Sequence, residues 1–241
     1  MVSGFKDEQR GFGVPMTADE LAGLNAMRRA KRKSELSASP AVRFLMYGKG
    51  KEGYWTFAHF SSQVDDVLDM YEYLYPGAQV AIEVDWSSGH SAHRPGALNT
   101  NSMGVKMGSK QATPRPSKMS AGCLGDGAVL KVGDIQHFAY RAGDPPPHFE
   151  PNVTEYIGKA KGKRQILWER GLWKVGMVEF VDDDDPKGRD QSMSMDYMLS
   201  LCEDFMKEKT ALQAMVEARG HILVMSPKGH CELAGQGIEY D

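Results

Sequence analysis

The sequence predicts an α/β fold, and one succession of patterns carries that prediction. Residues 42–47 and 79–85 are short runs rich in β-branched and aromatic residues, which favour β-strands. Between them, apolar residues recur at helical spacing over residues 57–75, and Pro76-Gly77 ends the pattern. A strand, a helix and a second strand in succession are typical of a sheet that is covered by helices.

Two further elements are expected before these. Residues 1–5 form a short apolar run that suits a strand. Thr17 and Glu20 have the spacing of a capping box, so a helix is predicted to begin there. That helix runs into a basic segment, whose cations include Arg28, Arg29, Arg32 and Lys33.

The middle of the chain has a different composition. Gly, Pro, Ser and Lys dominate residues 86–155, which predicts irregular structure with short strands at 129–132 and 136–140. A basic helix is expected over residues 158–171, and an acidic loop follows at 182–185. The cations of this helix include Lys161, Lys163, Arg164 and Arg170.

Regular structure is expected to return near the C-terminal end. Residues 195–201 and 205–219 predict one helix or two, and residues 221–225 predict a final buried strand. We therefore divide the chain into three parts. Residues 1–85 and 191–241 would form the two halves of a core, and residues 86–190 would be a loop-rich insertion with a basic helix.

Composition narrows the class of protein. The 241 residues are 41% hydrophobic and 25% charged, as in ordinary globular proteins, so global disorder is not predicted. The net charge of −3 gives no general attraction to DNA, so any such contact depends on local basic patches. Three widely spaced cysteines do not suggest a disulfide framework. No signal peptide and no apolar run of the roughly 18 residues that a membrane span needs is recognisable.

Two acidic residues are candidate metal ligands. Asp85 ends a predicted strand, and ligands of open α/β sheets bind at the carboxyl ends of strands. Glu239 follows the last predicted strand, in what looks like the first turn of a helix. Mg²⁺ and Mn²⁺ prefer such oxygen ligands. The alternative is that Asp85 caps a turn and Glu239 is a surface side chain.

Other groups are less specific. His90, His93, His230 and Cys231 are zinc-competent residue types, but no Cys-x-x-Cys pair accompanies them. The basic segments could contact DNA phosphates, although such runs more often form solvated helix faces.

Five segments together resemble a known family. In chain order they are residues 1–5 (MVSGF), 50–56 (GKEGYWT), 84–93 (VDWSSGHSAH), 166–172 (ILWERGL) and 227–240 (PKGHCELAGQGIEY). This ordered set resembles the DDE-superfamily transposase-like endonuclease domains of eukaryotic transposable elements, which are distantly similar to Tc/mariner proteins. The resemblance extends over nearly the whole chain, and no single motif decides it.

The resemblance implies an RNase H-like mixed sheet in which three acids bind two Mg²⁺ or Mn²⁺ ions for DNA strand cleavage and transfer. Asp85 matches the second acid, and Glu239 matches the third. No residue here matches the first acid, which would lie on a central strand before residue 1. The resemblance therefore predicts a core that is truncated at both ends, weak metal binding, and little or no cleavage by this chain.

Several alternatives remain open at the level of sequence. One is a non-catalytic, transposase-derived DNA-binding module that uses the two basic segments. Others are a non-functional gene fragment and a small zinc protein. A sheet without its central strand would leave backbone groups unpaired, so self-association is also expected. A nuclear location is implied by the resemblance alone.

Overall fold

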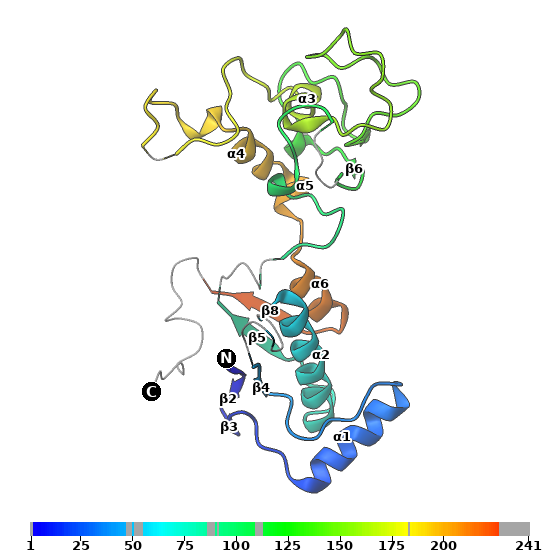
Figure 1. The fold of residues 1–241 in the computed structure, drawn as a ribbon, viewed down its shortest axis with the longest axis vertical. Coiled ribbons are helices and arrows are strands. Elements are labelled where there is room, and N and C mark those ends of the chain that lie inside the picture. The colour runs from blue at the N-terminus through cyan, green and yellow to red at the C-terminus, as the bar shows by residue number, and fades with distance from the viewer. Residues whose placement is uncertain are drawn as a thin grey trace. The chain divides into compact units, whose positions relative to one another are not determined.

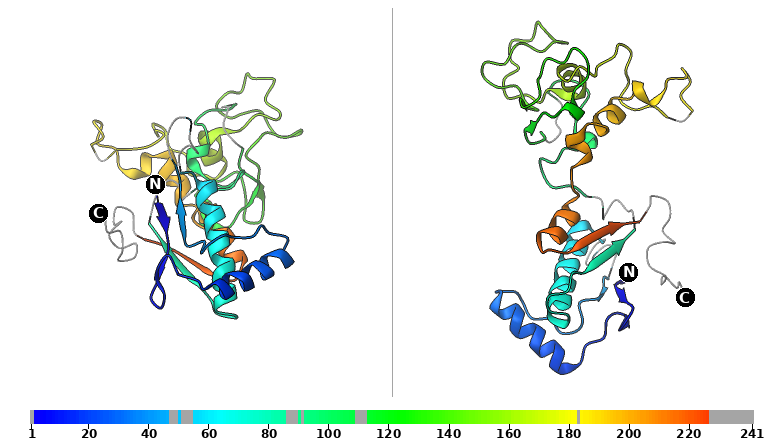
Figure 2. Two further views of the ribbon diagram at one scale, coloured as in Figure 1. Left: turned by 60° about the horizontal axis from the view of Figure 1, so that its bottom comes forward. Right: turned by 180° about the vertical axis from the view of Figure 1, so that it is seen from behind.

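A computed structural model describes residues 2–46, 50, 55–85, 90, 92–108, 113–182 and 184–226. The chain forms two compact units, drawn in Figures 1 and 2. The core unit comprises Met1–Ala92 and Lys209–Asp241, and the inserted unit comprises His93–Glu208. Both helices and strands are present, so the α/β prediction is confirmed.

The core unit holds strands that come together in pairs. β1 pairs antiparallel with β4, β2 pairs antiparallel with β3, and β5 pairs in parallel with β8. The elements of this unit, in chain order, are β1 (Val2–Gly4), β2 (Lys6–Asp7), β3 (Gly11–Phe12), α1 (Ala18–Ala30), β4 (Val42–Phe44), α2 (Phe57–Leu74), β5 (Ala81–Val84), α6 (Ala211–Ala218) and β8 (Ile222–Met225).

The parallel pair of β5 and β8 lies against two helices. Figures 1 and 2 show α2 and α6 beside this pair of strands. Ile82 is paired with Leu223, and both side chains belong to a core that residues of α2 and α6 complete. Alternate residues of a strand point to opposite faces, so Ile222 and Val224 lie on the other face, where they are 43% and 44% exposed. The burial of one face explains why this register is specified.

Helices α1 and α2 agree with their sequence signals. The Thr17 hydroxyl accepts a hydrogen bond from the Glu20 amide at 3.2 Å, and the Glu20 carboxylate accepts one from the Thr17 amide at 2.8 Å, so the capping box is confirmed. Helix α2 runs from Phe57 to Leu74, one residue short of the predicted end. None of the helices in the described ranges is long and apolar enough to span a bilayer.

The inserted unit has a hydrophobic core of its own. Its apolar residues gather around Ile166, Leu167 and Leu199, all of which are fully buried. Its elements, in chain order, are η1 (Thr100–Ser102), β6 (Ser117–Lys118), η2 (Ala121–Cys123), β7 (Ile135–Gln136), α3 (Gly162–Glu169), η3 (Gln191–Met193), α4 (Met195–Ser200) and α5 (Glu203–Met206). β6 pairs antiparallel with β7.

Several expectations differ from the structure. The helix expected over residues 205–219 is divided into α5 and α6, and the strand expected over 136–140 is shortened to β7. Residues 129–132 form no strand, because the Val129 and Leu130 amides both donate to the Glu169 carbonyl, at 3.0 and 3.1 Å, and so join no ladder. Helix α3 is shorter than 158–171, because the backbone before Gly162 bonds to residues 138–140 instead. Residues 191–208 lie in the inserted unit, whereas the sequence placed the return to the core at 191.

Candidate functional site

Asp85 stands where β5 ends. The Ser226 amide donates to the Val84 carbonyl at 2.8 Å. Asp85 and Ser226 are therefore the residues that directly follow the two paired strands, at the carboxyl edge of the parallel pair. The Ser226 hydroxyl also donates to the Glu83 carboxylate at 3.1 Å. With its side chain 39% exposed, Asp85 offers an accessible carboxylate at the edge where open α/β sheets bind ligands.

His90 contacts this carboxylate directly. Its Nδ1 lies 2.6 Å from Asp85 Oδ1 and 3.0 Å from the Asp85 main-chain oxygen. The imidazole also packs on the ring of Phe60 in α2, with 4.1 Å between ring centroids. His90 therefore connects the candidate acid to the core beneath it.

None of the other candidate ligands belongs to the described part of the core unit. Glu239, His230 and Cys231 lie outside the described residues. His93 belongs to the inserted unit, where its Nδ1 lies 3.3 Å from Asn99 Nδ2. The pairing of Asp85 with Glu239, and the zinc alternative, stay predictions.

The first basic segment is engaged in ion pairs. Arg28 and Lys33 contact the carboxylates of α2, and Arg29 pairs with Glu35 at 2.6 Å on the surface. Arg32 is exposed and has a left-handed backbone with a φ of 58°. The Arg28 side chain is only 4% exposed, so its position favours a structural role over contact with phosphates.

In the second basic segment, Lys161, Lys163 and Arg164 are also paired within the chain. Lys161 Nζ lies 3.0 Å from Glu169, and Lys163 Nζ lies 2.6 Å from Glu179. Arg164 pairs with Glu150, and its guanidinium stacks 4.4 Å from the centroid of an aromatic ring, that of Phe149. The two lysine side chains are 9% and 2% exposed, so they offer little charge to an external ligand; DNA binding through them stays a prediction.

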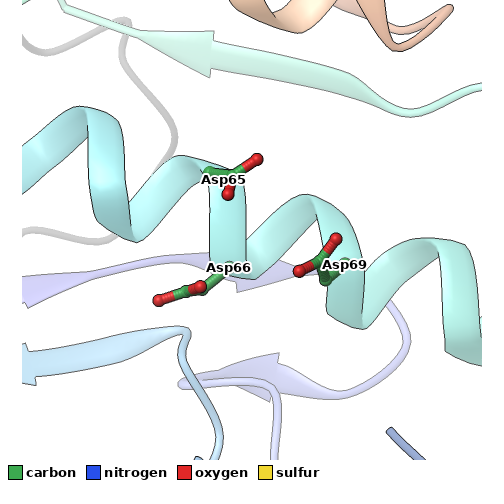
Figure 3. A group of neighbouring side chains, drawn as sticks. All are labelled: Asp65, Asp66 and Asp69. Carbon is green, nitrogen blue, oxygen red and sulfur yellow. The ribbon is translucent and has the colours of Figure 1, made fainter. Parts of the chain in front are cut away.

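A group of carboxylates that sequence reasoning missed lies on α2. Ligand atoms of Asp65, Asp66 and Asp69 come within 4.8 Å of one another, which is the spacing of a potential metal site (Figure 3). The signal was visible in the sequence, because residues four apart on a helix share a side.

Cations of the protein itself occupy this group. Three of them lie 2.7 Å from the buried carboxylate of Asp69: Arg28, Lys33 and Arg219. The same cations contact the two other aspartates. A metal ion would have to displace all of them, so we interpret the group as a salt-bridge network that holds α1, α2 and the segment before β8 together.

The charges of this network depend on one another. Burial alone would raise the pKa of Asp69, but hydrogen bonds from Lys33 and Arg219 outweigh it and hold the pKa below its ordinary value. Burial disfavours the charged form of Arg219, yet hydrogen bonds to Glu72 and Asp69 raise its pKa. Asp69 and Arg219 therefore each favour the charged form of the other.

Comparisons with protein-family models, with curated proteins and with solved structures found no match for this chain. The arrangement of residues described above is therefore the basis on which a function can be argued.

Proposed function

We propose that the core unit is the RNase H-like part of a transposase-derived DDE endonuclease-like domain, whose chemistry is metal-dependent cleavage and transfer of DNA strands. The observation that carries the proposal is the position of Asp85 at the carboxyl edge of the parallel β5–β8 pair. The sequence resemblance assigns the second acid to this residue.

The strand pairings support the same proposal. An RNase H-like sheet would contain the antiparallel β1–β4 pair and the parallel β5–β8 pair, with α2 as the connection from β4 to β5. A central strand that carries the first acid would join these two pairs. Among the described residues no strand occupies that place, and the two pairs are separate sheets.

The donor set suits a hard divalent cation. Asp85 provides carboxylate oxygens, and the resemblance adds Glu239. A bound Mg²⁺ or Mn²⁺ would activate the attacking hydroxyl and stabilise the leaving oxygen. Within the described ranges, Asp85 is not part of any group of three potential ligands. We therefore propose that this chain binds the ion weakly and cleaves DNA little or not at all.

The test is a titration with Mn²⁺, followed by electron paramagnetic resonance of the free ion. Asp85→Asn and Glu239→Gln are each expected to weaken binding about tenfold or more, because each removes one of few anionic ligands. Asp126→Asn is the matched control, since it removes the same charge from an exposed residue of the inserted unit. Absence of Mn²⁺ binding, or equal binding by wild type and Asp85→Asn, would refute the proposal.

A further inference from the structure

We infer that His90 is a positioning residue for Asp85: its Nδ1–H holds one carboxylate oxygen and so directs the other toward a divalent cation. This inference rests on the proposed function, because it assigns a task to His90 only if Asp85 binds a metal. It concerns the metal-binding geometry and makes no claim about the first acid.

The hydrogen position on His90 follows from its neighbours. Nδ1 faces two oxygens of Asp85, the carboxylate Oδ1 at 2.6 Å and the main-chain carbonyl at 3.0 Å. A main-chain carbonyl can only accept a hydrogen bond, and an ionised carboxylate likewise only accepts. Nδ1 must therefore carry the hydrogen, whichever state the rest of the ring is in.

Packing fixes the direction of this donor. The imidazole is 18% exposed and lies on Phe60, with a centroid separation of 4.1 Å and an interplanar angle of 34°. Phe60 is itself 6% exposed and stacks on Phe5 at 6.0 Å. Because the ring packs on a buried side chain of the core, the hydrogen bond restricts the rotation of the Asp85 carboxylate.

The restriction has a consequence for metal binding. Hydrogen bonds to ligating carboxylates pre-orient them, and loss of such a partner typically costs about 10–100-fold in metal affinity. The contact with His90 uses Oδ1, so Oδ2 is the carboxylate oxygen that this hydrogen bond directs toward the cation.

Two substitutions separate the donor from the ring. His90→Asn keeps an N–H donor close to the position of Nδ1 but loses the ring. His90→Phe keeps an aromatic ring on Phe60 but loses the donor. Mn²⁺ affinity is expected to fall about 10–100-fold in His90→Phe and to stay within about threefold of wild type in His90→Asn.

Two outcomes would contradict the positioning role of His90. Unchanged Mn²⁺ affinity in His90→Phe would overturn the inference. So would an equal loss in both variants, which would make the ring, or direct ligation by His90, the cause. Should His90→Phe fail to fold by circular dichroism, His90→Met supplies an apolar side chain without the donor, and the same loss is expected.

The inference and the proposed function fail differently. If wild type binds Mn²⁺ and Asp85→Asn does not, but His90→Phe binds as wild type does, only the positioning role is wrong. If Asp85→Asn leaves the affinity unchanged, the proposed function itself is wrong.

Discussion

Replacing Asp69 by Asn tests whether the carboxylates of α2 are a structural network. The Asp69 side chain is 0% exposed and lies 2.7 Å from Arg28, Lys33 and Arg219. Removing one partner of a buried ion pair costs about 3–5 kcal/mol. Each of the three cations keeps another carboxylate, so we expect the lower limit, about 3 kcal/mol of unfolding free energy.

The loss can be measured on the core unit alone. Hydrogen exchange of peptides from α2, followed in increasing urea, reports the opening of that unit without signal from the inserted one. For a chain of this size, a loss of that amount lowers the melting temperature by roughly 6–12 °C. Asp65→Asn is the matched control on the same helix: its side chain is 36% exposed, and its loss should cost about 1 kcal/mol or less.

The dependence on pH gives a second measurement. Because the pKa of folded Asp69 lies below its ordinary value, near 4 in unfolded chains, the carboxylate stabilises the fold at pH values above that range. This stabilisation is lost as the pH falls through the folded pKa. The difference between wild type and Asp69→Asn should therefore be full at pH 7 and shrink in acid. Equal stability of Asp69→Asn and Asp65→Asn at pH 7 would refute the network.

Three further predictions concern the inserted unit. Arg170→Ala should destabilise it by about 3–5 kcal/mol in urea unfolding, because Asp204 would lose a buried bidentate partner at 2.9 and 2.8 Å. Arg94→Ala is the control, and it should cost little because Arg94 is exposed. Cys202 is buried and burial raises its thiol pKa, so mass spectrometry should find its alkylation by iodoacetamide at least about tenfold slower in the native than in the unfolded chain. Replacement of residues 93–208 by a short Gly-Ser linker should leave the core unit folded by circular dichroism, with its Mn²⁺ affinity within about threefold; an unfolded product would contradict the two-unit division.

Local signals predicted much of the core unit. Thr17 and Glu20 specify the start of α1 through their own side chains, so neighbours in sequence suffice to find it. The apolar spacing of α2 and the β-branched residues of β5 are equally local. These elements have the predicted type, and their ends differ by a residue or two.

Long-range partners could not be predicted in the same way. Arg219 contacts Asp65, although more than a hundred residues separate them, and no pattern near either one indicates the other. The start of helix α3 at Gly162 also depends on a partner that is distant in sequence, the backbone of Lys106. That glycine has a φ of 80°, and an added Cβ would come 2.6 Å from the Lys106 backbone. The helical spacing of the basic residues therefore predicted a longer helix than the structure has.

The sequence predicted one part of the candidate site, the position of Asp85, but not the role of His90. Asp85 was found because a strand pattern ends on it, and that position depends only on local residues. The task of His90 depends on its contact with Phe60, which belongs to a helix earlier in the chain. The His-x-x-His spacing is typical of a zinc-ligand pair, whereas His90 and His93 belong to separate units.

The insertion explains how β5 and β8 can be neighbours despite their separation in sequence. The Ala211 amide donates to the Ala92 carbonyl at 2.8 Å, so the chain leaves and re-enters the core unit at adjacent points. A segment whose ends already meet can grow into a unit with its own core at little entropic cost to the sheet, because the closure penalty rises only slowly with length. The edge that carries Asp85 is therefore set by α2, α6 and the two strands, and the core of the inserted unit can vary without moving it.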